Sequence, residues 1–141
     1  MRKTIIGVMG PGSNATENDK QNAYTLGQLI AEKGWFLLTG GRNAGVMDAA
    51  SKGAKNKNGF TIGIIPTSDN TNTSEFVDVA IITSMASARN NINVLSCDVV
   101  IACGMEAGTA SEVAMAIKAG KNVIMLTDNE EAKSFFRNLR P

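Results

Sequence analysis

Apolar, β-branched runs alternate along the chain with stretches of helical periodicity. The runs predict strands at residues 4–9, 36–39, 61–65, 79–83, 98–102 and 122–126. The stretches between them predict helices at residues 17–33, 45–57, 86–96, 109–119 and 130–139. Four of the strands are almost continuously apolar, as is typical of a parallel sheet covered on both faces. We therefore expect one α/β domain over residues 1–141, a Rossmann-like, doubly wound parallel sheet with helices on both faces.

Ligands of such sheets bind at the carboxyl ends of the strands, near the point where the strand order reverses. Four of the loops that follow strands are rich in glycine or carry an arginine: "GPGSNAT", "GGRNAG", "SMASARNN" and "CGMEAGT". The segment "PTSDNTNTSEFVD" has no strong helical pattern and is expected to be a polar loop. The four loops are the candidates for a binding site.

The first loop carries Gly10 and Gly12 after the first strand. Its glycines miss the GxGxxG spacing of a dinucleotide site, and the second strand lacks the terminal acid that would hold a ribose. One interpretation is a strand–helix turn in which Ser13 or Asn14 caps the helix. The other is that the glycines let a ligand approach the backbone. The residues of this loop leave both open.

The second loop combines Gly40, Gly41 and Arg42 with a helix start at Gly45. Asn43 is a suitable cap for that helix. A glycine in the first turn is less favourable than alanine by up to ~1 kcal/mol, so we expect Gly45 to accommodate something that approaches closely. Free N–H groups at this helix end would favour an anion. Arg42 either adds positive charge there or is simply solvated.

The other two loops carry the charged candidates. Thr109 and Glu112 fit a capping box, with Thr109 as N-cap, which alone explains their spacing. Glu106 would repel a phosphate, and a carboxylate directed into the site would move that phosphate to the loop at residues 40–45. Arg89 is expected in the first turn of its helix, where a cation opposes the helix dipole by roughly 0.3–1 kcal/mol. It is either a tolerated surface residue or is aimed at an anionic ligand, paired with Glu112.

Composition narrows the function further. Fourteen basic and thirteen acidic side chains give a net charge of +1, which offers no case for nucleic acid or an anionic membrane as partner. No apolar run is long enough to span a bilayer, so we expect a cytoplasmic protein. The chain has no histidine, and Cys97 and Cys103 match neither a redox pair nor a zinc site. We expect two buried free thiols and no protein-bound metal.

Longer motifs resemble a known family. "LLTGGRNAGVMDAASKGA" and "GTASE" resemble the GGxxGxM and PGGxGTxxE segments of the lysine-decarboxylase-like superfamily, which includes the Lonely guy phosphoribohydrolases. "IIGVMGPG" and "SARNNINVLS" narrow the resemblance to the molybdenum cofactor carrier proteins. At the position of the Pro-Gly-Gly of that motif the chain has Gly104, Met105 and Glu106.

The resemblance implies a homo-oligomeric carrier, tetrameric in relatives, that binds molybdenum cofactor (Moco) and protects it for delivery to enzymes such as nitrate reductase. The resemblance implies a binding protein and not a catalyst, and the charge balance leaves nucleic acid and membrane out of the expected partners. We expect the cofactor, a pterin with a dithiolene-bound molybdenum and a phosphate, to contact residues of the four loops: Gly10, Gly12, Ser13, Gly40, Gly41, Arg42, Gly45, Arg89, Asn90, Gly104, Gly108, Thr109, Ser111 and Glu112.

Two alternatives share this pocket. Arg89 and Glu112 occupy the motif positions of the catalytic pair of the phosphoribohydrolases, so the chain could release a base from a nucleoside 5′-monophosphate. Glu112 would then activate water, and Arg89 would orient the phosphate or the attacking group. The second alternative is a nucleotide-binding domain without catalysis.

Overall fold

The computed structural model describes residues 2–140, and its core is a six-stranded sheet in which every neighbouring pair is parallel. The strands are β1 (Ile5–Met9), β2 (Phe36–Thr39), β3 (Phe60–Ile65), β4 (Val79–Ile82), β5 (Val99–Cys103) and β6 (Asn122–Leu126). The helices are α1 (Glu17–Glu32), α2 (Gly45–Asn56), the 3₁₀ helix η1 (Ala86–Arg89), α3 (Asn90–Leu95), α4 (Ala107–Lys118) and α5 (Glu130–Asn138). The expected doubly wound fold and its strands are confirmed.

The strand order is β4-β3-β2-β1-β5-β6, so β1 lies between β2 and β5. The chain moves outward from β1 to β4, then crosses over and continues from β5 on the other side of β1. The carboxyl ends of β1, β2 and β5 therefore surround the point where the strand order reverses. A doubly wound sheet offers its ligand crevice at this point.

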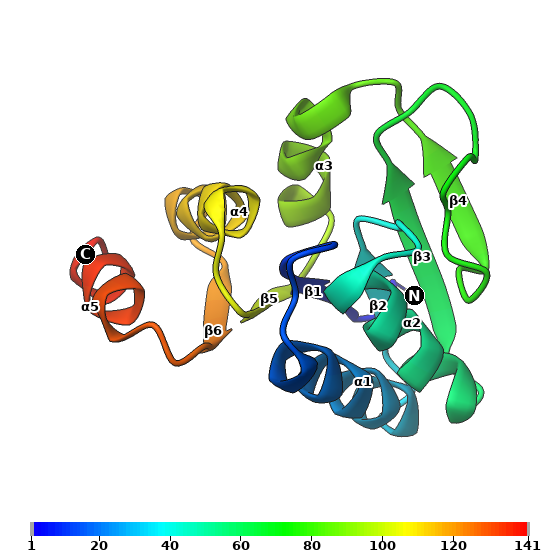
Figure 1. The fold of residues 1–141 in the computed structure, drawn as a ribbon, viewed down its shortest axis with the longest axis horizontal. Helices are drawn as coiled ribbons and strands as arrows, with labels where there is room; N and C mark the ends of the chain where they lie inside the picture. Colours follow the sequence, from blue (N-terminus) through cyan, green and yellow to red (C-terminus); the bar gives the residue numbers. More distant parts are fainter. Residues whose placement is uncertain (1, 141) are drawn as a thin grey trace.

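Helices cover both faces of the sheet, as Figure 1 shows: α1 and α2 lie below it in that view, and α3 and α4 above it. On the α1–α2 face, Val8, Leu37 and Val46 belong to one buried cluster. On the other face, Met9, Leu38 and Val94 belong to a second cluster. The two faces of each inner strand are thus both buried, which accounts for the continuous apolar runs in the sequence.

The start of α1 differs from the sequence-based expectation. The cap is Thr16, neither Ser13 nor Asn14. The Asp19 N–H donates to Thr16 Oγ1 at 3.0 Å, and the Thr16 N–H donates to Asp19 Oδ2 at 3.2 Å. This reciprocal capping box satisfies two N–H groups and leaves residues 10–15 as a longer loop over the end of β1.

Helices α1 and α2 cross closely because each helix has a glycine that lies against the backbone of the other helix. A Cβ built on Gly53 would collide with the carbonyl of Tyr24, and a Cβ on Gly27 would collide with the carbonyl of Ala50. Both glycines are buried within helices, where glycine alone would be unfavourable. The close helix pair holds the start of α2 against the loop that follows β1.

We predict that Gly53→Ala destabilises the protein by about 2–3 kcal/mol, although alanine ordinarily favours a helix, because the added methyl must push α1 and α2 apart. Gly108→Ala is the matched control, since a Cβ there meets no atom within 4 Å. Chemical denaturation of both variants measures the effect. Equal stability of Gly53→Ala and wild type would show that the helices separate at little cost.

Candidate functional site

A cavity of about 270 Å³ opens at the carboxyl ends of the strands, at the reversal point of the sheet. Its walls come from the loops after β1, β2 and β5 and from the η1–α3 segment after β4. The residues that line it are Met9, Gly10, Gly12, Ser13, Gly40, Arg42, Met47, Ser87, Arg89, Asn90, Asn93, Glu106, Gly108, Thr109 and Glu112. All four loops that the sequence singled out therefore meet at one pocket.

The floor of the pocket is polar and buried. Asn93, Thr109, Glu112 and Arg89 have exposed fractions of 1%, 2%, 7% and 8%. By contrast, the rim residues Ser13, Arg42, Ser87, Glu106 and Gly108 are exposed. Buried polar side chains need hydrogen-bond partners, so the question at the floor is which of these groups have one.

Arg89 is held on three sides. Its Nε donates to the Ile64 carbonyl at 2.7 Å, Nη1 to Asn90 Oδ1 at 2.7 Å and Nη2 to the Gly40 carbonyl at 3.3 Å. It thereby joins α3 to the ends of β2 and β3, and two of its five N–H donors have no partner among the described residues. A Cβ on Gly40 would lie 2.8 Å from both the guanidinium and Met47 Sδ, so glycine is needed there.

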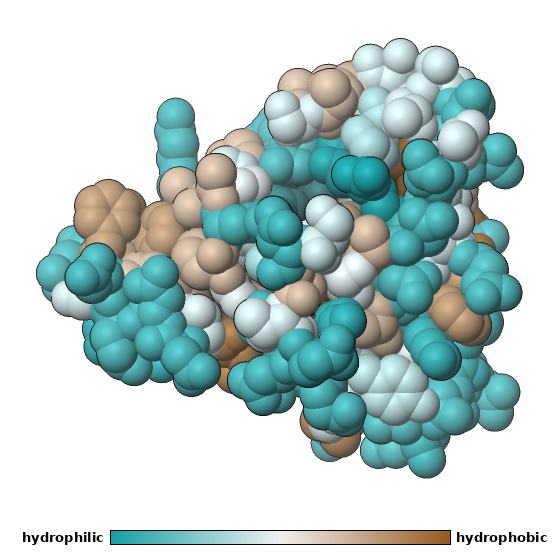
Figure 2. Space-filling model, viewed as in Figure 1, coloured by the Kyte–Doolittle hydropathy of each residue, from teal (hydrophilic) through white to brown (hydrophobic). Residues whose placement is uncertain are grey.

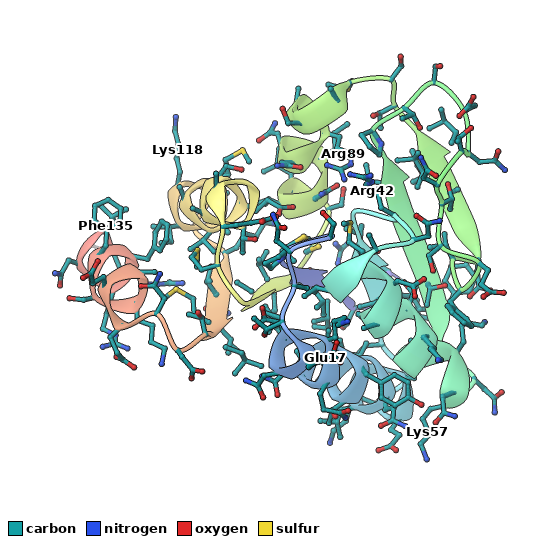
Figure 3. The ribbon with its side chains drawn as sticks, viewed as in Figure 1. Glu17, Arg42, Lys57, Arg89, Lys118 and Phe135 are labelled. Carbon is teal, nitrogen blue, oxygen red and sulfur yellow. The ribbon has the colours of Figure 1, made fainter. Side chains whose placement is uncertain are left out.

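Arg89 was expected in the first turn of a long helix, and that expectation is wrong. It ends the 3₁₀ helix η1, and α3 begins at the next residue. Arg42 lies close to it, and Figure 3 shows both side chains in the space between α3 and α2. In the space-filling view, hydrophilic residues gather at this place (Figure 2). Arg42 is exposed and forms no ion pair with any residue from 2 to 140.

Glu112 and Asn93 form a hydrogen-bonded pair across α4 and α3. The Asn93 Nδ2 donates to Glu112 Oε2 at 3.0 Å. Burial raises the pKa of Glu112 to about 7, opposed by the Asn93 hydrogen bond and by the positive charge of Arg89. No ion pair within 4.0 Å joins Glu112 to Arg89 in the described chain, so the two interact through space.

The start of α4 overturns the predicted capping box. The helix begins at Ala107 with Glu106 as N-cap, so Thr109 and Glu112 lie inside it rather than at its end. Thr109 Oγ1 and Asn93 Oδ1 are buried and have no hydrogen-bond partner in the part of the chain that the structure describes. The N–H groups of Gly108 and Thr109 also have no acceptor among the described residues. A helix N-terminus with free N–H groups favours an anion.

Several predicted site residues support the walls instead of lining them. Gly41, Gly45 and Gly104 all have positive φ, and the chain itself fills the space beside them: Ile65 and Gly63 at Gly41, Pro11 and Gly12 at Gly45, and Asp19 at Gly104. Ser111 donates to the Gly108 carbonyl at 2.6 Å and accepts from Asn90 Nδ2 at 3.3 Å.

The start of α2 also differs from the expectation of an open anion site. Its N-cap is Ala44 and no side chain caps it, so Asn43 does not have that role. The Val46 N–H donates to the Pro11 carbonyl at 3.0 Å, and the Asp48 N–H to Ala44. What approaches Gly45 is therefore the loop after β1.

Sequence reasoning missed Met9, Met47, Ser87 and Asn93 as lining residues and did not include Glu106 in the predicted site. Asn93 follows Arg89 by four residues, a spacing that places both on the same face of a helix. That signal was present in the sequence. The methionines gave no signal because they read as ordinary core residues, and both are indeed buried.

The two cysteines are free and buried, as expected, and burial raises the pKa of each thiol to about 12. Neither lines the pocket. Among residues 2–140, no group of three or more cysteine and acidic side chains is arranged to hold a metal ion. No helix in this part of the chain is long and apolar enough to cross a membrane.

The sequence profile of the SLOG cluster4 family matches residues 3–140. The chain belongs to this family. The structure of the molybdenum cofactor binding protein of Rippkaea orientalis is 61% identical and superposes with a TM-score of 0.98, over 99% of this chain and 85% of that one. The Moco carrier protein of Chlamydomonas reinhardtii is 52% identical with a TM-score of 0.91, over 98% and 85%. An Archaeoglobus fulgidus protein is 44% identical over 126 residues, 89% of this chain and 82% of its own.

We predict that the free energy of unfolding of Glu112→Gln, relative to that of the wild type, is higher at alkaline pH than at acid pH. The pKa of Glu112 rises from 4.5 to about 7 on folding, so the wild type is favoured below pH 4.5 and loses that contribution as the pH rises through 7. The variant, which cannot ionise, should gain about 2 kcal/mol on the wild type between pH 5 and pH 8.5. Denaturation at both pH values measures this difference.

Glu32→Gln is the control, because Glu32 is an exposed carboxylate at the end of α1. Its stability relative to wild type should change little between the two pH values. A Glu112→Gln difference that does not grow with pH would contradict the raised pKa.

Proposed function

We propose that the protein is a cytoplasmic carrier of molybdenum cofactor that binds the cofactor in the pocket at the sheet edge and shields it before transfer. The single observation that carries this proposal is the 61% identity to the cofactor-binding protein of Rippkaea orientalis over 99% of the chain. The pocket contributes a second, independent reason, because its buried floor has hydrogen-bonding groups without a partner among the described residues.

The chemistry of the cargo matches the donor groups of the pocket. The free N–H groups of Gly108 and Thr109 lie at the positive end of the α4 dipole. Such a position favours an anion and suits the terminal phosphate of the cofactor. The Thr109 hydroxyl can complete that site, and Arg42 adds charge from the rim. Glu106 also lines the rim, at the N-cap of α4. The alternative phosphate position at the start of α2 is closed, because the Pro11 and Gly12 carbonyls lie against Gly45 and the Val46 N–H donates to Pro11, so we place the phosphate at the start of α4. The thioethers of Met9 and Met47 are soft, polarisable contacts for sulfur.

Thr109→Val tests this arrangement because valine keeps the shape of threonine and removes the hydroxyl. We expect cofactor retention after gel filtration, assayed as released pterin, to weaken by on the order of 10-fold. Thr25→Val, on the exposed face of α1, is the matched control and should retain the cofactor as wild type does. If wild type retains no more pterin than an unrelated protein, the carrier proposal fails.

One observation favours the phosphoribohydrolase as a second candidate. Glu112, whose burial raises its pKa to about 7, lines the pocket together with Arg89, and a carboxylate with such a pKa suits a general base. Incubation with AMP and with an N6-prenylated AMP, followed by chromatography for free base, separates the two functions. A carrier releases none, whereas base release that disappears in Glu112→Gln would establish the hydrolase.

We further propose that the carrier is a homo-oligomer, such as a tetramer, and delivers its cargo to a molybdoenzyme such as nitrate reductase. The edge strand β4 supports the first part, because Val79, Ile81 and Ile82 are each more than 40% exposed on an unpaired sheet edge. Light scattering at several concentrations measures the subunit number, and a monomer throughout would refute it.

A further inference from the structure

The pocket has hydrogen-bond acceptors at its floor that no residue from 2 to 140 satisfies. Asn93 turns its Nδ2 toward Glu112 Oε2, so its Oδ1 is left without a donor although the side chain is only 1% exposed. The other oxygen of Glu112, Oε1, receives no hydrogen bond from the described residues. A buried acceptor left unpaired costs about 1–3 kcal/mol, so this part of the floor is complementary to a ligand that donates.

The opposite character prevails at the start of α4. There the free groups are the N–H donors of Gly108 and Thr109, which call for an acceptor and favour an anion. Glu112 lies four residues farther along the same helix, about 6 Å along its axis at 1.5 Å per residue. The pocket therefore has free N–H donors at the helix start and unpaired acceptors at Asn93 and Glu112, which form its acceptor end. The two unpaired N–H donors of Arg89 lie at the same floor.

A ligand that fits both ends carries an anion at one end and a group of hydrogen-bond donors at the other. We propose that Asn93 and Glu112 read the amino and ring N–H edge of a pterin whose phosphate lies on the N–H groups of Gly108 and Thr109. This assignment rests on the proposed carrier function and adds to it the orientation of the cargo and the residues that select a pterin. Asn93 acts both by accepting from the pterin and by holding the Glu112 carboxylate in place.

Electrostatics agree with this orientation. The reverse placement would put a phosphate against Glu112 and the donor edge against N–H groups, which pairs like with like at both ends. The charged side chains do not distinguish the orientations, because each end has one arginine and one carboxylate: Arg89 with Glu112 at the floor, and Arg42 with Glu106 at the rim. The distinction therefore comes from the fixed donors of α4 and the acceptors of Asn93 and Glu112.

The test compares 6-hydroxymethylpterin phosphate with the corresponding lumazine phosphate, in which an oxo group replaces the 2-amino group. Fluorescence titration of wild type should give tighter binding of the pterin by on the order of 10- to 100-fold, because the lumazine presents an acceptor to the acceptors of the floor. In Glu112→Gln and in Asn93→Leu this ratio should fall to within about threefold of unity. Inhibition of binding by inorganic phosphate should change by no more than a few-fold in Glu112→Gln, because the helix start is intact.

Three controls make each outcome decisive. Glu32→Gln should keep the wild-type ratio of pterin to lumazine affinity, and if Asn93→Leu fails to fold, Glu112→Gln decides alone. A second ligand pair, AMP and 2′,3′-dideoxy-AMP, detects a floor that binds ribose hydroxyls. If the variants lose the preference for AMP over dideoxy-AMP and keep the pterin-to-lumazine ratio, the proposal is overturned.

Retention of molybdenum cofactor by the wild type, measured in parallel with these titrations, separates the carrier proposal from the assignment of the pterin edge to Asn93 and Glu112. Retention with an unaltered pterin ratio in the variants refutes only the pterin assignment, whereas no retention refutes the carrier function.

Discussion

The buried guanidinium of Arg89 is the interaction on which the pocket depends. A charged group this deep is costly unless it is hydrogen-bonded, and Arg89 meets the condition by donating to the ends of β2 and β3 and to Asn90. These bonds hold the short helix α3 over the sheet and place Asn93, one turn later, at the floor. Its charge also limits how far burial can raise the pKa of Glu112. Arg89 thus contributes to the position of α3, to the shape of the floor and, after burial and the Asn93 hydrogen bond, to the ionisation of Glu112.

The sheet, its helices and the convergence of four loops were predictable from the sequence, because they follow from hydrophobic periodicity and from the geometry of parallel sheets. The capping of α4 was not. Thr109 and Glu112 have the spacing of a capping box, but Gly104, at positive φ, turns the chain early enough for the helix to start at Ala107. The spacing of residues in the sequence does not reveal where a strand ends and the chain turns. That turn decides whether the side chains of Thr109 and Glu112 cap the helix or line the pocket.

Glycines show the same limit in another form. Gly12 and Gly108 line the pocket and leave room for a Cβ, whereas at Gly41, Gly45 and Gly104 the chain packs against itself. Gly10 and Gly40 do both: they line the pocket, and the chain fills the space beside them. A close approach by a ligand and a close approach by the protein's own backbone require the same residue. Only the fold distinguishes them, since it shows what occupies the space where a Cβ would be.

A carrier and a hydrolase can share this pocket and still differ in what they require of Glu112. Binding needs groups that satisfy the ligand in its ground state, whereas hydrolysis needs groups that stabilise a transition state more than the ground state. One oxygen of Glu112 accepts a hydrogen bond from Asn93, and the other receives none from the described residues. Unpaired acceptors of this kind satisfy a donor-rich ligand in its ground state. The unpaired acceptors of Asn93 and Glu112 thus suit the binding of a donor-rich ligand, and the same buried carboxylate, with its raised pKa, is the group that hydrolysis would use.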